Sequence, residues 1–449
     1  MKVSAERRGY SGAVVRASIS ENGLVITAGL LEAILSRGNM NAAYKRVKSN
    51  KGAGGVDRMS VDELFGWLVE HGAEMLEQIR DGRYKPSPVR RVEIPKETRG
   101  EFRKLGVPTV VDRVVQQAIA QVLTWIYEKK FSEASYGFRP KRSAHDALKR
   151  CKTNVDEGYV YVVDMDLEKF FDTVCHSKLM QVISRTIRDG RVLSLIHKYL
   201  NAGAMVKGLF ERTEVGTPQG GPLSPLLSNI MLNELDRELE RRGLRFVRYA
   251  DDCMIFCRSR KAAERALAHI LPFIEGKLFL KVNRQKTQIA HISRVKYLGY
   301  GFYIKKGRCR YRIHPKSVQK LKSKLRVITS RSNGWGVEYR QMRLRQFVRG
   351  WVNYFKLADM KKLLETADEW LRSRIRAIYW KQWKRIRTRF ENLQRLGIRK
   401  ERAWEWANSR KSYTRTAHSP ILTKSLTNER LAAQGWTTLS GEYRRCCAA

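Results

Sequence analysis

Two stretches near the middle of the chain decide its fold: YVYVVDMDLEKFFD at residues 159–172 and FVRYADDCMIF at residues 246–256. The first opens with a β-branched and aromatic run without a breaker, which predicts a buried strand that ends at carboxylates. The second places two such runs around an Asp pair, which predicts a hairpin with an acidic turn. Because neighbouring strands lie about 4.8 Å apart, Asp166 and Asp251 on adjacent strands would be close enough to share cations.

Carboxylates that end two neighbouring strands are typical of a two-metal site, whose ions sit about 3.5–4 Å apart. A simpler interpretation of Asp251 and Asp252 is a solvated turn, because Asp favours turns through local hydrogen bonds. Both predicted strands are apolar and both carry carboxylates at one end. This favours the metal interpretation, since buried carboxylates need cations or hydrogen-bond partners. The chemistry that this pattern predicts is nucleotidyl transfer.

The composition points to a polyanionic partner. The 449 residues contain 88 Lys and Arg against 44 Asp and Glu, a formal charge of +44, on a chain that is 43% hydrophobic. Such an excess of positive charge on a folded chain favours nucleic acid. A membrane partner is disfavoured because no run of 18 apolar residues exists and the charge is spread along the chain. Seven scattered cysteines without a Cys-x-x-Cys pair indicate neither a disulfide framework nor a zinc site. We expect a soluble cytoplasmic protein of two or three domains.

Several segments around the acidic stretches are typical of a surface that binds phosphates. A glycine-rich, basic loop at residues 51–57 follows a helical pattern and lacks the Walker spacing, so a flexible contact with a nucleic-acid backbone fits it better than nucleotide hydrolysis. Residues 89–96 and 103–108 are predicted to be paired strands that carry Lys96 and Arg103 toward an anion. A helix is predicted from 112 to 130, and the loop GTPQGGPLSP at 216–225 leaves Gln219 to point at a ligand before another helix.

The last third of the chain is helical in pattern and strongly basic from residue 317 to about 390. Further on, Lys and Arg remain frequent, with tryptophans at 380, 383, 404 and 406 among them. One interpretation is an amphipathic bundle whose charges are merely solvated. The other, which we favour, is a surface that follows phosphates and stacks bases on its aromatic side chains.

The order of the motifs resembles the reverse transcriptases encoded within bacterial group II introns, in the type that lacks an endonuclease module. The resemblance extends from about residue 28 to 443. It rests on RKLGVP (103–108), YGFRP (136–140), the Asp166 strand, TPQGGPLSP (217–225), YADD (249–252), NRQKT (283–287), YLGY (297–300) and QFVRGWVNYF (346–355).

The resemblance implies a role for individual residues. Asp166, Asp251 and Asp252 would be the catalytic carboxylates that hold two Mg²⁺ ions, and Phe171 would exclude a 2′-hydroxyl from the sugar pocket. Asp164 lies on the same strand face as Asp166, but only Asp166 has Phe171 at the family's spacing of five residues. The remaining assignments are Lys96 and Arg103 on the triphosphate, Gln219 on the incoming nucleotide, Lys286 near the site, and Arg345, Arg349, Lys381 and Lys384 on nucleic acid. We call this last group the four basic thumb residues.

The resemblance also implies the fold and the function. The expected fold is α+β: a right-hand polymerase with fingers and palm, built from an antiparallel sheet plus helices, followed by an α-helical thumb or maturase domain and a small basic C-terminal segment. The expected domains are a helical N-terminal extension with the glycine-rich loop (1–75), fingers and palm (76–305), thumb (306–390) and a DNA-binding tail (391–449).

The expected activity is RNA-directed DNA synthesis in the bacterial cytoplasm, with intron-RNA binding that promotes splicing and retrohoming. The expected partners are the intron RNA, an RNA template with a DNA primer, target DNA and deoxynucleoside triphosphates (dNTPs), without a membrane. Two other hypotheses stay open: a splicing factor with an unused polymerase site, and a reverse transcriptase domesticated for defence or sequence diversification.

Overall fold

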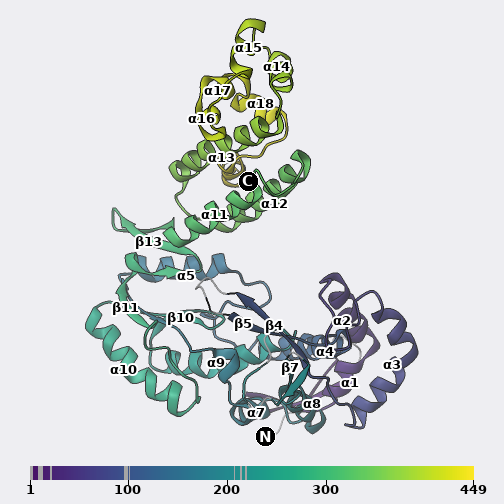
Figure 1. Cartoon of the computed structure of the whole chain (residues 1–449). Helices are drawn as coiled ribbons and strands as arrows, with labels where there is room; N and C mark the ends of the chain where they lie inside the picture. The colour runs from purple at the N-terminus through teal and green to yellow at the C-terminus, as the bar shows by residue number, and fades with distance from the viewer. Residues whose placement is uncertain are drawn as a thin grey trace. The chain divides into compact units, whose positions relative to one another are not determined.

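The computed structural model describes residues 4–8, 14–20, 23–95, 100, 102–206, 208–212, 215–217 and 220–448. The chain divides into two compact units, Met1–His291 (unit 1) and Ile292–Ala449 (unit 2), which Figure 1 shows in purple to green and green to yellow. Residues 292–305, which we expected in the palm, thus group with the helical part of the chain. In the part of the chain that the structure describes, no helix is long and apolar enough to cross a membrane.

The sheet that carries the acidic stretches is four-stranded and antiparallel throughout, in the order β11-β6-β10-β9. Its two central strands are apolar on both faces: Val162 and Val163 of β6 and Met254 and Ile255 of β10 are fully buried. Helix α10 contacts β6, β10 and β11, and α5 and α9 contact β9. The predicted strand and hairpin are confirmed. The bounds are β6 (Tyr161–Met165), β9 (Arg245–Tyr249), β10 (Asp252–Cys257), β11 (Gln288–His291), α5 (Ala144–Asp156), α9 (Ser224–Arg241) and α10 (Arg260–Gly276).

A second sheet of unit 1 has the order β5-β4-β7-β8. Its first pair is antiparallel, as the sequence predicted for the fingers, whereas β4 and β7 run parallel. Helix α4 begins directly after β5, and the Thr109 hydroxyl caps it by accepting from Asp112 N at 3.1 Å. The bounds are β4 (Val89–Pro95), β5 (Phe102–Val107), β7 (Ala204–Val206), β8 (Leu209–Glu211) and α4 (Val110–Tyr127).

The remaining helices of unit 1 share one apolar core with α4, α9 and α10. A buried carboxylate braces this core: Asp112 accepts from Tyr84 Oη at 2.8 Å, Tyr199 Oη at 3.2 Å and Ser87 N at 3.1 Å. Burial raises the pKa of Asp112, and the hydrogen bonds oppose that rise. The bounds are α1 (Leu30–Leu35), α2 (Arg37–Ser49), α3 (Leu64–Arg80), α6 (Phe170–Thr173), α7 (His176–Ser184) and α8 (Gly190–Leu200).

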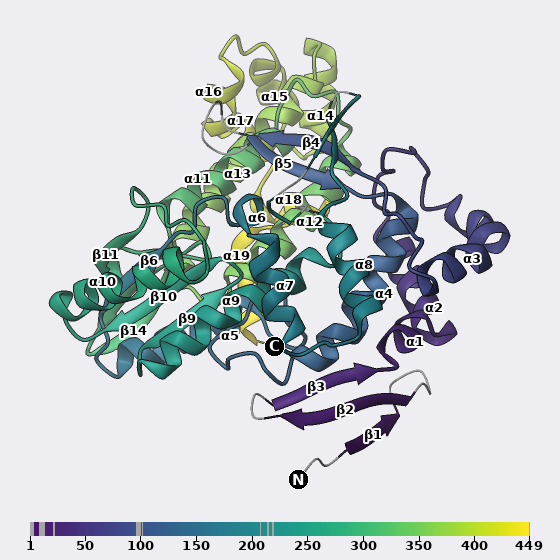
Figure 2. The same cartoon turned by 90° about the horizontal axis from the view of Figure 1, so that it is seen from below.

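The expectation of a helical N-terminal extension is correct from residue 30 onward but wrong before it. Strands β1 (Ser4–Arg8), β2 (Val14–Ser20) and β3 (Gly23–Ala28) form an antiparallel sheet, which Figure 2 shows. The β-branched residues of β2 and β3 are the local signal for strands. The glycine-rich loop, which we expected to be flexible, is held by hydrogen bonds to a neighbouring strand: Arg90 donates to Gly54 O from Nε at 3.2 Å and from Nη2 at 2.8 Å.

Unit 2 is mainly helical, with a small antiparallel sheet in the order β12-β13-β14. The expected separate tail is instead packed into this unit, because α16 contacts α13 and α19 contacts both α12 and α13. Asp368 accepts from Leu439 N at 2.7 Å and Ser440 N at 2.9 Å, and Trp436 is buried. The bounds are η1 (Ile292–Arg294), β12 (Lys296–Tyr297), β13 (Tyr300–Lys305), β14 (Arg308–Ile313), α11 (Pro315–Ile328), α12 (Val337–Phe355), α13 (Lys361–Gln382), α14 (Ile386–Arg395), α15 (Lys400–Ala407), α16 (Tyr413–His418), α17 (Pro420–Ser425), α18 (Asn428–Ala433) and α19 (Leu439–Ala448).

Candidate active site

The end of β6 and the β9–β10 turn bring two of the predicted catalytic carboxylates opposite each other. Strands β6 and β10 pair with Cys253 opposite Met165 and Met254 opposite Asp164. One step further along the same register, Asp252 faces Asp166. Directly opposed side chains of an antiparallel pair have Cβ atoms about 4.5–5.5 Å apart. Asp251 lies in the turn itself, between Ala250, whose φ is 58°, and the first residue of β10.

The NRQKT segment is anchored on Asp166. Asp166 N donates to Thr287 Oγ1 at 3.2 Å, and Asn283 N donates to Asp166 O at 2.9 Å. These bonds bring Lys286 Nζ to 3.9 Å from Asp166 Oδ2. The ammonium group of Lys286 is therefore at the edge of the carboxylate cluster, where the resemblance put a basic residue.

Asp164, the extra acid on the same strand face, has a different environment. Gln288 Nε2 donates to Asp164 Oδ2 at 3.1 Å across the β6–β11 pair. Burial raises the pKa of Asp164, the bond from Gln288 opposes that rise, and the nearby charge of Asp166 adds to it. Asp164 thus has a partner inside the sheet, whereas Asp166 lies just past the strand end, beside the turn.

The acidic residues suit hard divalent cations. Carboxylate oxygens are the ligands that Mg²⁺ prefers, and Mg²⁺ is commonly held by one or two carboxylates together with waters and substrate phosphates. Within the described ranges, no three His, Cys, Asp or Glu side chains gather closely enough to hold an ion alone. The opposed pair Asp166 and Asp252, with Asp251 at the turn, therefore fits a site that substrate phosphates complete.

Phe171 and its neighbour Phe170 have different environments. Phe170 is 2% exposed and belongs to the core, whereas Phe171 is half-buried, with the two rings edge to face at 5.4 Å. The GTPQGG loop begins directly against this turn, because Thr217 N donates to Phe171 O at 2.6 Å. A Cβ on Gly216 would stand 2.8 Å from Phe171 O, so this approach needs a glycine. The sugar-gate role of Phe171 stays a prediction.

Of the residues expected to contact the incoming nucleotide from the fingers and the GTPQGG loop, the structure describes only Arg103. Lys96 and Gln219 lie outside the described residues. Arg103 is exposed on β5, opposite Ile94 of β4. Its guanidinium is thus on the surface of the hairpin, as a residue that meets a triphosphate would be, and its role stays a prediction.

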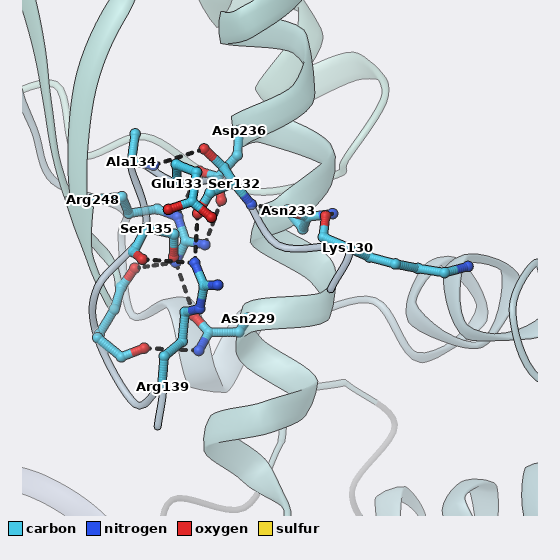
Figure 3. Close-up of polar contacts among 12 residues, drawn as sticks. Lys130, Ser132, Glu133, Ala134, Ser135, Arg139, Asn229, Asn233, Asp236 and Arg248 are labelled. Carbon is cyan, nitrogen blue, oxygen red and sulfur yellow. Dashed lines mark hydrogen bonds and ion pairs between the residues drawn. The ribbon is translucent and has the colours of Figure 1, made fainter. Parts of the chain in front are cut away.

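A buried arginine beside the acidic turn was missed by the sequence analysis. The side chain of Arg248 is 0% exposed and makes a bidentate ion pair with Asp236 of α9, from Nε at 2.7 Å and from Nη2 at 2.6 Å (Figure 3). Its Nη1 donates to Asn229 Oδ1 at 3.0 Å and to Ala250 O at 2.8 Å. Burial raises the pKa of Asp236, and the Arg248 charge opposes that rise. The only local signal was a charged residue inside a strand, directly between the apolar Val247 and the aromatic Tyr249.

The YGFRP segment closes over the same turn. Asn229 Nδ2 donates to Gly137 O at 2.8 Å, and Tyr136 N donates to Arg248 O at 2.9 Å. A Cβ on Gly137 would stand 2.2 Å from Ala250 N. The acidic turn is thus enclosed by the backbone of the YGFRP segment and by helix α9.

The four basic thumb residues have unequal environments in unit 2. Arg345 and Lys384 are exposed, whereas Arg349 Nε lies 3.9 Å from Glu442 Oε1 and Lys381 Nζ donates to Arg331 O at 2.9 Å. The stacking role expected of the tryptophans is contradicted for two of them. Trp380 and Trp383 are buried, and the guanidinium of Arg389 lies 4.4 Å from the Trp380 ring, so both are core residues. Trp404 is 58% exposed.

A cleft of about 530 Å³ lies within unit 2, between the β12–β13 turn and helices α11 and α12. Lys320 and Lys324 line it from α11 and Trp351 from α12. The combination of ammonium groups with an aromatic wall is typical of surfaces that bind single-stranded nucleic acid. The sequence analysis missed these lysines, because nothing in their local pattern separates them from Lys316 and Lys322 of the same helix.

Comparison with known proteins identifies two families of domains in the chain. Residues 94–302 match the family model described as "Reverse transcriptase (RNA-dependent DNA polymerase)", and residues 318–397 match "Group II intron, maturase-specific domain". The chain is 36% identical over 285 residues to Protein YkfC of Escherichia coli. The aligned region covers 55% of this chain and 74% of that protein.

A second relative is matched over only part of its length. The chain is 31% identical over 329 residues to Group II intron-encoded protein LtrA of Lactococcus lactis subsp. cremoris, of which it spans 55%. Among solved structures, a chain of a "Partial Cas6-RT-Cas1--Cas2 complex" is 26% identical with a TM-score of 0.37, covering 56% of this chain and 43% of that one.

Proposed function

The chain belongs to the family of group II intron-encoded reverse transcriptases with a maturase-specific domain, and on that premise we propose that it copies RNA into DNA and binds its intron RNA. The substrates would be dNTPs and an RNA template with a DNA primer. The bound intron RNA would be spliced with the help of the protein and carried to a DNA target. The observation that supports the polymerase most is that Asp166 follows the end of β6 and Asp252 begins the paired strand β10, beside the turn that carries Asp251.

The reaction is an in-line attack of the primer 3′-hydroxyl on the α-phosphate of a dNTP, with pyrophosphate as the leaving group. Asp166, Asp251 and Asp252 would hold two Mg²⁺ ions, which when bound activate the nucleophile and stabilise the leaving group. Lys286, close to Asp166, adds positive charge at the rim of the cluster.

The other substrate contacts follow from placement and chemistry. Phe171, half-buried against the GTPQGG loop, would lie under the sugar, where its ring leaves no room for a 2′-hydroxyl. Arg103 on the exposed fingers hairpin would meet the triphosphate through charge-assisted hydrogen bonds. We keep Lys96 and Gln219 in the same roles by resemblance alone.

Intron-RNA binding is assigned to unit 2. The exposed Arg345 and Lys384 and the cleft that Lys320 and Lys324 line offer many phosphate contacts. Such contacts position a nucleic acid without reading its sequence. Arg349 and Lys381 already have partners within unit 2 and would contribute less.

The test is primer extension on an RNA template with dNTPs and Mg²⁺. Asp251→Ala is expected to abolish extension, because it removes a ligand shared by the two ions. Asp62→Ala, which removes an exposed carboxylate of unit 1, is the matched control and should extend like the wild type. If Asp251→Ala extends at the wild-type rate, the polymerase site lies elsewhere.

A second variant separates the two activities. Asp251→Ala combined with Asp252→Ala should lose DNA synthesis but keep intron-RNA binding and splicing of a cognate precursor RNA, because the basic surface of unit 2 is untouched. A wild-type protein that promotes splicing without extending any primer would support the splicing-factor hypothesis. Loss of splicing in the folded double variant would contradict the division of labour proposed here.

A further inference from the structure

We propose that Arg248 is a positioning residue of the polymerase site, which fastens the acidic turn to helix α9 and so fixes the direction of Asp251 and Asp252. This inference rests on the proposed polymerase activity and deepens it. The observation behind it is the hydrogen bond from Arg248 Nη1 to Ala250 O, made by a guanidinium that is itself held by Asp236 and Asn229 (Figure 3).

The carbonyl that Arg248 holds belongs to the peptide unit that leads into Asp251. Ala250 has a φ of 58°, a left-handed conformation that is unfavourable for an L-residue with a side chain. A residue in such a conformation persists only when its surroundings hold it there. The peptide plane between residues 250 and 251 sets the direction of the Cα–Cβ bond of Asp251. The hydrogen bond to Ala250 O therefore also fixes the position of the Asp251 carboxylate.

Stability alone does not account for a guanidinium at this place. Arg248 and Asp236 are both 0% exposed, so both lose their hydration on folding. A buried ion pair of this kind is often no more stabilising than apolar side chains of similar volume. Apolar residues at both positions would satisfy the packing, but they would leave Ala250 O and Asn229 Oδ1 without the donor that now reaches them.

The partners around position 248 need a side chain that can donate several hydrogen bonds in different directions. Nε and Nη2 engage the two oxygens of Asp236, which leaves Nη1 for Ala250 and Asn229. Asn229 in turn donates to Gly137 O, so the same network links the turn to the YGFRP segment. The fork of arginine fits this set of partners in a way that the single ammonium of lysine does not.

The decisive experiment compares Arg248→Met with the double variant Arg248→Met, Asp236→Leu in the full-length chain. The single variant leaves a carboxylate buried without its partner, which is strongly destabilising, so its melting temperature should fall. The double variant removes that carboxylate and should melt above the single variant, although Ala250 O and Asn229 Oδ1 still lack their donor. Its kcat should nevertheless stay low, on the order of 10²-fold below the wild type, because a carboxylate misplaced by about 1 Å costs that much.

A metal-binding readout complements the kinetics. Mn²⁺ binding to the full chain is followed by electron paramagnetic resonance, with a dNTP and a primer whose 3′ end is a dideoxynucleotide, so that no reaction occurs. The double variant should need at least about tenfold more Mn²⁺ for half-saturation, while its KM for dNTP at saturating metal stays within about twofold of the wild type.

Asp112→Ala is the matched control. Asp112 is also buried in unit 1, but it accepts hydrogen bonds from Tyr84, Tyr199 and Ser87 and does not contact the turn. This variant should lower the melting temperature and leave the Mn²⁺ half-saturation unchanged.

Two outcomes would overturn the inference. One is a double variant with wild-type kcat and Mn²⁺ binding. The other is an Asp112→Ala variant with the same loss of Mn²⁺ affinity, which would make the effect a general result of destabilising unit 1. A wild-type protein without primer extension would refute the proposed polymerase function instead, so the two failures are distinguishable.

Discussion

Replacing Gly137 with Ala should slow DNA synthesis by about 100-fold, through a steric contact with the acidic turn. The added Cβ would stand 2.2 Å from Ala250 N and 2.9 Å from Tyr249 C, whereas ordinary van der Waals contact begins at 3.4 Å. Both atoms are backbone, so no side-chain rotation relieves the overlap, and one segment has to move by roughly 1 Å. Because Ala250 precedes Asp251, the movement displaces a carboxylate, and a misplacement of that size costs about 10²-fold in rate.

The assay is single-turnover primer extension on an RNA template, with intron-RNA binding measured by filter retention on the same preparation. Binding should be unchanged, because the basic surface that we assign to RNA lies in unit 2. Gly66→Ala is the control: residue 66 is exposed in α3 with nothing within 4 Å of its added Cβ. That variant should gain up to about 1 kcal/mol of stability and extend normally. A folded Gly137→Ala protein that extends as fast as the wild type would refute the reasoning.

Three further predictions concern other parts of the chain. Phe171→Val should raise ribonucleotide incorporation by opening the sugar pocket, without a change in template binding; equal discrimination in the variant would make Phe171 a core residue. The pKa of Glu238 is held at about 2, chiefly by the hydrogen bond from Arg241 and then that from Arg242, so its stabilising contribution is complete above pH 4.5 and is lost as pH falls through about 2. Urea unfolding should therefore show Glu238→Gln to be less stable by about 0.2–1 kcal/mol at pH 7, a deficit that shrinks below pH 4.5. Alanine at the four basic thumb residues should weaken intron-RNA binding and splicing and flatten the log–log salt slope of filter retention by about 1–3, since each neutralised phosphate of a single strand contributes about 0.7; an unchanged slope would place the RNA on another surface.

Much of the palm is predictable because its signals are local. The β-branched run before Asp166 and the runs on both sides of the YADD turn predict strands without reference to the rest of the chain. Their pairing follows from the hairpin and from the need to bury two apolar faces. The environment of Asp164 was not predictable, because its partner Gln288 lies 124 residues away.

The features that the sequence analysis missed are set by distant partners. Whether Arg248 points to solvent or to Asp236 depends on how α9 packs on β9, and nothing in the local pattern shows it. The tryptophans at 380 and 383 are compatible with an RNA surface as well as with a core, and only the tertiary packing around them decides between the two. The N-terminal strands had a local signal, but it was not used.

The packing of α19 also sets an order of events during synthesis. Asp368 of α13 and its partner Leu439 are 71 residues apart, which a ribosome adding about 5–20 residues per second takes roughly 4–14 s to cover. All of unit 1 has been translated before residue 439 is added. Helices α12 and α13, by contrast, lack their packing partner α19 until that point. The catalytic half can therefore reach its native state on the ribosome well before the half that we assign to the intron RNA. A nascent chain stalled before residue 439 would carry a complete set of palm carboxylates with an unfinished unit 2.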